Sequence, residues 1–68
     1  GDRTFVLRQG IWTDTGYNAE GIPMEHVVFL SDEYFALLAA HPEIGEILAL
    51  GERVLVMIDG TAYLIMPE

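Results

Sequence analysis

The stretch RVLVMIDGTAYLIM, residues 53–66, decides the fold of this chain. Two apolar, strand-forming runs flank Asp59-Gly60, a dipeptide that favours a two-residue type I′ turn because both central residues need positive φ. The register that follows has three pairs: Ile58 with Thr61, Val56 with Tyr63, and Val54 with Ile65. Both faces of this hairpin are apolar, so we expect it at the centre of a sheet and covered twice. Helices are expected on one face, and the N-terminal hairpin or a neighbouring domain on the other.

Residues 4–15 are predicted to form a second hairpin, because β-branched and apolar residues lie on both sides of a turn at Gly10. Gly10 suits the left-handed position of a type I turn with a bulge, which pairs Leu7 with Ile11. A strict two-residue turn pairs Arg8 with Ile11 instead. The first register is favoured, and the second stays open.

Turn residues fill positions 16–24, which are predicted as a surface loop, and residues 25–30 are predicted as a third strand. Ser31 then has the side chain and position of a helix N-cap. The helix should end near His41, because a residue before proline avoids helical dihedrals.

Pro42 fits the first turn of a second, short helix, since proline at that place loses no helical hydrogen bond. Gly51 is the expected C-terminal stop of this helix. The predicted order is strand, strand, strand, helix, helix, strand, strand. It indicates an α+β fold with a small, mainly antiparallel sheet and the helices packed on one face.

The length of 68 residues allows one small domain, spanning residues 1–68. The chain opens without an initiator Met and without the basic and apolar regions of a signal peptide, so we expect it to be a piece of a longer protein. A formal net charge of -8 argues against binding nucleic acid or an anionic membrane surface. No apolar run is long enough to insert this segment into a bilayer.

Catalytic machinery is not evident, and we predict that the chain is not an enzyme. Cysteine and lysine are absent, which excludes thiolate, Schiff-base and P-loop chemistry. Ser31, the single serine, is a helix cap. His26 and His41 have no metal-ligand spacing between them, and a structural or merely exposed role is favoured for each. No catalytic, cofactor or metal residue is therefore assigned, and no cofactor is expected.

Aromatic residues are the candidates for an interaction surface, because aromatic side chains dominate protein interfaces. They are Trp12, Tyr17 and Tyr63. The core is the favoured place for Trp12 and Tyr63, whereas Tyr17 lies in a polar loop and is the better contact candidate. The three arginines, Arg3, Arg8 and Arg53, are expected to form local ion pairs with the surrounding acids.

An alternative function is the binding of a small ligand or a hard cation by loop carboxylates. Asp14, Asp32 and Glu33, with Tyr17, would supply the ligands if folding brought them together. The simpler interpretation of these carboxylates is a helix cap and solvated side chains.

Three segments carry a resemblance to a known family: TFVLRQGIWTDT at 4–15, FLSDEYFALL at 29–38 and LALGERVLVMIDGTAY at 48–63. Together they resemble the C-terminal segment of bacterial proteins with VIT and von Willebrand factor A domains, relatives of the inter-alpha-trypsin inhibitor heavy chains. The shared residues are those of turns, caps and core, so the likeness points to a fold more than to a mechanism.

The resemblance implies a non-catalytic accessory module for domain packing or protein–protein interaction within a larger protein that is secreted or associated with the cell envelope. Its partners would be other domains of that protein or another protein, and a homodimer through the apolar hairpin is left open. The Asp-x-Ser-x-Ser metal motif of von Willebrand factor A domains has no counterpart here, so metal binding does not carry over to any residue.

Overall fold

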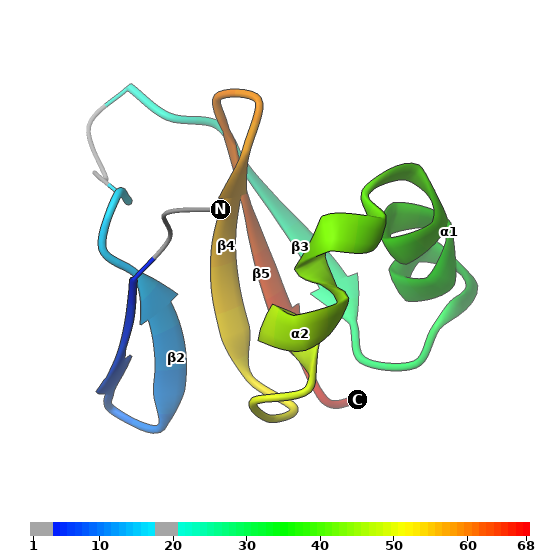
Figure 1. Ribbon diagram of the computed structural model, residues 1–68, viewed down its shortest axis with the longest axis horizontal. Helices are drawn as coiled ribbons and strands as arrows, with labels where there is room; N and C mark the ends of the chain where they lie inside the picture. The colour runs from blue at the N-terminus through cyan, green and yellow to red at the C-terminus, as the bar shows by residue number, and fades with distance from the viewer. Residues whose placement is uncertain (1–3, 18–20) are drawn as a thin grey trace.

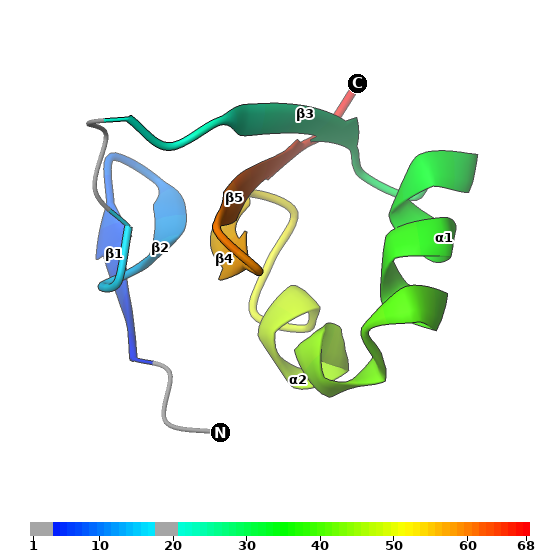
Figure 2. The ribbon, with the colours of Figure 1, turned by 90° about the horizontal axis from the view of Figure 1, so that it is seen from above.

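The computed structural model describes residues 4–17 and 21–68 (Figure 1). Within these residues, five strands form one sheet in the order β1-β2-β4-β5-β3, and the helices lie on one side of it (Figure 2). The predicted α+β fold is confirmed, but the sheet is mixed rather than mainly antiparallel, with two antiparallel and two parallel pairings. The elements are β1 (Phe5–Arg8), β2 (Ile11–Asp14), β3 (Met24–Val28), α1 (Asp32–Ala40), the 3-10 helix η1 (Pro42–Ile44), α2 (Gly45–Leu48), β4 (Val54–Ile58) and β5 (Thr61–Met66).

The β4–β5 hairpin has the turn and register that the sequence predicts. Asp59 and Gly60 both have positive φ, 48° and 83°, as a type I′ turn requires. Residues Val54 and Ile65 at the far end of the hairpin are paired and fully buried. The turn chemistry therefore sets the register of the two strands at the centre of the sheet.

The β1–β2 hairpin takes the register that was left open, and the favoured bulged register is wrong. Arg8 pairs with Ile11 across a two-residue turn in which Gln9 has φ 52° and Gly10 has φ 80°. Gln9 joins Gly10 in the left-handed region because a type I′ turn matches the right-handed twist of the two strands.

Two parallel pairings place the β4–β5 hairpin at the centre of the sheet. β2 lies parallel to β4, and the Trp12 N–H donates to the Arg53 carbonyl oxygen at 3.0 Å just before β4. β3 lies parallel to β5, and the Phe29 N–H donates to the Met66 carbonyl oxygen at 2.8 Å. The N-terminal hairpin thus extends the sheet by hydrogen bonding. The expectation that it covers one face of β4–β5 is wrong.

Local chemistry sets the helix boundaries. The Ser31 hydroxyl accepts from the Tyr34 N–H at 3.2 Å, which confirms the predicted N-cap of α1. His41 has φ -134° and ψ 72°, extended as a residue before proline must be, and Pro42 opens η1. Side chains from η1 and α2 then enter the core against the central strands; the buried residues are Ile44, Leu48, Val54, Val56 and Ile65.

The third strand ends at Val28, two residues before the predicted end at position 30. Leu30 has φ 66°, which breaks the extended backbone. The Ser31 N–H closes the resulting turn by donating to the Val28 carbonyl oxygen at 3.1 Å. Of the predicted loop at 16–24, residues 18–20 lie outside the described residues.

Gly51 is not the helix stop that the sequence predicts. α2 ends earlier, at Leu48, with Ala49 as its C-cap, and Gly51 has no positive φ. A Cβ at Gly51 would lie 3.4 Å from Cδ1 of Trp12. The glycine therefore lies against the indole ring, and its backbone needs no left-handed freedom.

Substitution by alanine is expected to change the stability of the protein differently at Gly60, in the β4–β5 turn, and at Gly51. Gly60→Ala should lower the free energy of unfolding by about 1–2 kcal/mol, because alanine is strained at positive φ. Gly51→Ala should leave it unchanged or raise it by up to about 1 kcal/mol, because the backbone is compatible and the new methyl group has room. Urea unfolding followed by circular dichroism measures both. A loss of more than about 1 kcal/mol for Gly51→Ala would contradict the assignment of Gly51.

Candidate interaction surface

The side of the sheet away from the helices is the candidate surface, and we call it the helix-free face. Because side chains alternate along a strand, the strand registers give its members. They are Val6, Arg8, Ile11, Thr13, Met24, His26, Val28, Leu55, Met57, Ala62, Leu64 and Met66. Its centre is closed, since Leu55 is 7% exposed and Ala62 is fully buried. Thr13 is also buried, and the other side chains around that centre are half-buried or exposed and mostly apolar.

All three methionines of the chain lie on this face: Met24, Met57 and Met66. Met24 is 38% exposed, and the other two are half-buried. Methionine is flexible and polarisable, which suits surfaces that adapt to another protein. The sequence carried part of this signal, since Met57 and Met66 have the parity that puts them on one face of the predicted hairpin. Met24 lay in the predicted loop, and only its pairing with Ala62 places it on this face.

Charge is segregated between the two sides of the sheet. None of the strand residues on the helix-free face is Asp or Glu, although the protein carries a net charge of -8. Arg8 lies at one end of the face. Arg53 comes directly before β4, so the alternation of side chains puts it on the same side as Leu55 and next to Ile11 of β2. The carboxylates of the described residues lie on helices, in turns, at the chain end or on the helix side of the sheet.

The predicted ion pairs of Arg8 and Arg53 do not form. Both residues are exposed, and among the described residues the one ion pair joins His41 Nδ1 to Glu43 Oε2 at 3.5 Å. For Arg8 the sequence gives a reason, because β1 and β2 carry a single acid, the buried Asp14. Arg3 lies outside the described residues. Two cations therefore remain available to a partner at the border of an apolar face.

The aromatic candidates lie elsewhere. Trp12 and Tyr63 are half-buried on the helix side of the sheet and pack against the core, which the sequence favoured for both. Tyr17 is half-buried after β2, and its N–H donates to the Asp14 carbonyl oxygen at 3.0 Å. The three aromatic residues do not form one surface.

Asp14 has a structural place in the sheet and is not a solvated loop carboxylate. It is 6% exposed; its Oδ1 accepts from the Gly16 N–H at 2.9 Å, and its Oδ2 accepts from the Met57 N–H at 3.2 Å. It lies on β2, whereas Asp32 and Glu33 begin α1 at the opposite end of the molecule (Figure 1). Folding does not bring the proposed cation ligands together.

Removing the Asp14 carboxylate is expected to destabilise the sheet. Asp14→Ala takes an acceptor from two backbone N–H groups and should cost about 1–3 kcal/mol of unfolding free energy. Asp14→Asn, which keeps one oxygen, should cost less. Glu46→Gln, at an exposed position of α2, is the control and should stay within about 0.5 kcal/mol of the wild type. If Asp14→Ala and Glu46→Gln unfold at the same urea concentration, the Asp14 carboxylate does not stabilise the sheet.

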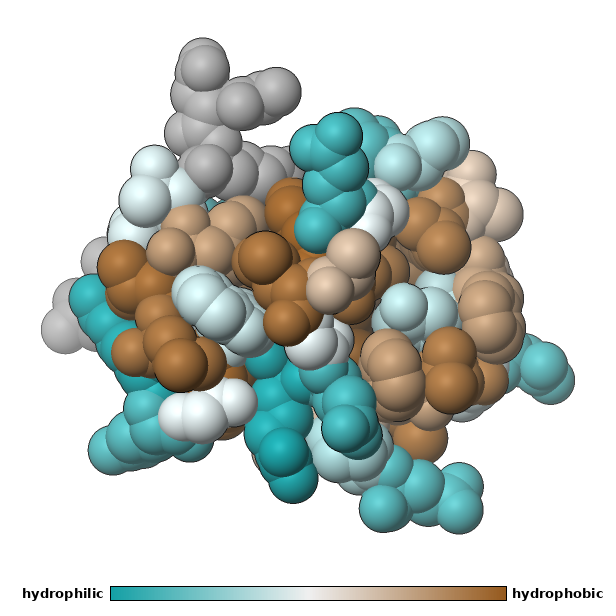
Figure 3. Space-filling model, turned by 60° about the horizontal axis from the view of Figure 1, so that its bottom comes forward, coloured by the Kyte–Doolittle hydropathy of each residue, from teal (hydrophilic) through white to brown (hydrophobic). Residues whose placement is uncertain are grey.

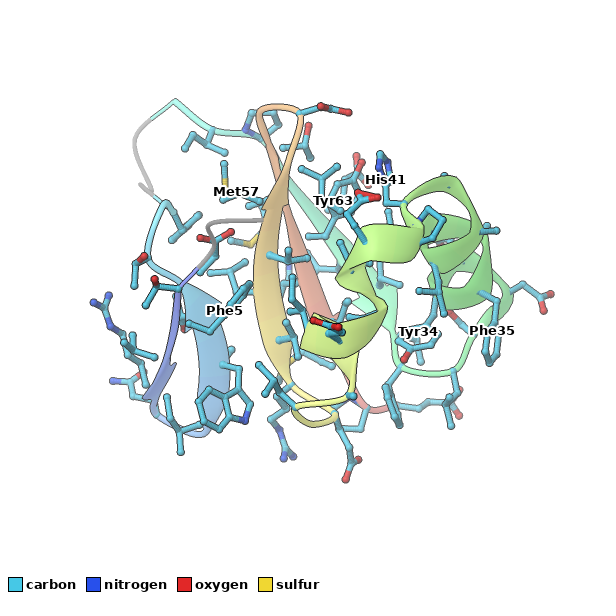
Figure 4. All side chains as sticks on the ribbon, in the orientation of Figure 1. Phe5, Tyr34, Phe35, His41, Met57 and Tyr63 are labelled. Carbon is cyan, nitrogen blue, oxygen red and sulfur yellow. The ribbon has the colours of Figure 1, made fainter. Side chains whose placement is uncertain are left out.

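A second exposed apolar group lies at the beginning of α1, and we call it the α1 start: Leu30, Asp32, Glu33 and Phe35. Leu30 is 57% exposed and Phe35 is 52% exposed, and both carboxylates are exposed. Phe35 points away from the sheet, whereas the buried Tyr34 meets it edge-on at 5.1 Å between ring centroids (Figure 4). Figure 3 shows hydrophobic and hydrophilic residues side by side on the face of the molecule that it presents.

Leu30 has an unfavourable backbone for its residue type. A leucine at φ 66° costs about 1–2 kcal/mol relative to glycine. We therefore expect Leu30→Gly to unfold at a higher urea concentration than Leu30→Ala, with a difference of about 1 kcal/mol. Both variants remove the side chain, so the comparison isolates the backbone. A more stable alanine variant would rule out the left-handed conformation.

The remaining candidates for chemistry stay separate. His26 is exposed in β3, and His41 follows α1. Among residues 4–17 and 21–68, no group of three His, Asp or Glu side chains is placed to hold a metal ion. No helix in the described part has the length and apolar composition needed to cross a membrane.

Comparisons with protein-family models, with curated proteins and with solved structures find no match for this chain. The resemblance to the C-terminal segment of VIT and von Willebrand factor A proteins stays a prediction, carried by the turn, cap and core motifs alone.

Proposed function

We propose that this chain is a non-catalytic accessory module that binds another protein surface through its helix-free face. The surface belongs to another domain of a larger protein or to a separate protein. The sequence motifs favour a VIT and von Willebrand factor A type of parent, secreted or associated with the cell envelope. Under this proposal the helices and the β4–β5 hairpin form a rigid platform, and the opposite side of the sheet makes the contact.

The observation that carries the proposal is the composition of the helix-free face. It is a mostly apolar surface with every methionine of the chain and no strand carboxylate, in a protein of net charge -8. At its border lie two arginines that form no ion pair with the residues that the structure describes. Methionine and arginine are enriched at protein interfaces. Covering the half-exposed apolar side chains removes them from water, which stabilises a complex by about 25 cal/mol per Å².

A titration tests this function. The 68-residue chain is added to the rest of the polypeptide encoded by its gene, and heat is measured by isothermal titration calorimetry. We expect saturable binding that weakens about tenfold or more for Met66→Glu, because the new carboxylate must be desolvated on an apolar face.

Glu46→Gln is the matched control, since it changes an exposed carboxylate on the helix side and should leave the affinity unchanged. Circular dichroism of both variants confirms that they fold. Equal affinities for Met66→Glu and Glu46→Gln would contradict binding through this face. The absence of heat with the wild type would exclude another domain of the same polypeptide as the partner.

A further inference from the structure

We infer that the helix-free face of one copy binds the α1 start of a second copy, so that the chain associates head to tail. This inference rests on the proposed function and names the partner of the same face. The inference rests on two surfaces of one molecule that are complementary in charge and that both expose apolar side chains.

The two surfaces are complementary in charge. The half of the helix-free face near β1 and β2 presents Arg8 and Arg53, and neither has an ion-pair partner among the described residues. The α1 start presents Asp32 and Glu33, both exposed and also without such a partner. Opposite charges facing each other favour encounter and fix orientation, whereas two helix-free faces together would bring arginines into one interface.

The two surfaces also match in apolar content. Leu30 and Phe35 project from the α1 start and are more than half exposed. On the helix-free face, the half-buried Ile11 and Met66 lie beside the arginines on neighbouring strands. They supply the apolar contact. Adaptable methionine side chains accept the ring and the leucine without a preformed pocket.

The two surfaces lie at opposite ends of the molecule, so a pair of copies still has one free surface of each kind. β1 and β2 lie at one end of the molecule and α1 at the other (Figure 1). A contact between different surfaces of identical chains is heterologous, so each added copy leaves one surface of each kind free. The assembly therefore grows with concentration unless a ring closes.

Two variants that each lose one surface test the inference. The face variant carries Arg8→Glu and Arg53→Glu, and the start variant carries Leu30→Asn and Phe35→Lys. All four positions are exposed, and asparagine tolerates the left-handed backbone at position 30. Circular dichroism checks the fold of both. The mass of each sample is measured by light scattering and sedimentation up to about 1 mM, the range of weak association.

We expect the wild-type mass to rise with concentration and to fall back when salt is raised, because the exposed charges are screened. Each variant alone should stay at the mass of one chain, 7.6 kDa. Their equimolar mixture should reach twice that mass and no more, because it retains a single intact pair of surfaces. Binding in the mixture, when neither variant binds itself, distinguishes head-to-tail contact from a dimer of two helix-free faces or of two α1 starts.

A wild type that stays monomeric up to about 1 mM would overturn the inference, and so would association that persists in either variant alone or a mixture that stays monomeric. The proposed function is judged separately. If the wild type is monomeric but still binds the rest of its polypeptide with the sensitivity to Met66→Glu described above, the second copy is the wrong partner and the face remains the binding surface.

Discussion

The structure depends on burying a hairpin that is apolar on both faces. The Asp59-Gly60 turn fixes the register of β4 and β5, and the side chains of one face enter the core with η1 and α2. Val54, Val56 and Ile65 are fully buried there. Among the described residues, helices cover one face only, because α1, η1 and α2 all lie in the single connection between β3 and β4. The other face is consequently left partly open, and that is the origin of the candidate surface.

The sheet around this hairpin is held by backbone pairing on both edges. β2 and β3 add in parallel, and the Asp14 carboxylate joins β2 to β4 through the Met57 N–H. A buried carboxylate that accepts backbone hydrogen bonds is costly to replace, since its removal leaves donors without that acceptor. Asp14 thus belongs to the platform. The residues left open to a partner are Arg8, Arg53, Met24 and Met66, together with the exposed apolar side chains.

The sequence predicts the local features well, because they depend on near neighbours. The Asp59-Gly60 turn, the Ser31 cap and the break at Pro42 each follow from one or two residues. Features that depend on distant pairing are missed: the parallel strands, the burial of Asp14 and the contact of Gly51 with Trp12. The candidate surface falls between these cases. Strand parity already gathers Met57 and Met66, but only the observed start of β3 and the strand order bring Met24 and the arginines onto the same face.

The methionine methyl groups provide the most direct test that the open face binds a second copy of the chain. Their signals are followed by NMR in a chain labelled with ¹³C at the methionine methyls while unlabelled copies of the same chain are added. The account predicts that the signals of Met24, Met57 and Met66 shift progressively, and that amide signals of the buried Val56 do not. Methionine signals that stay unchanged up to about 1 mM would contradict it.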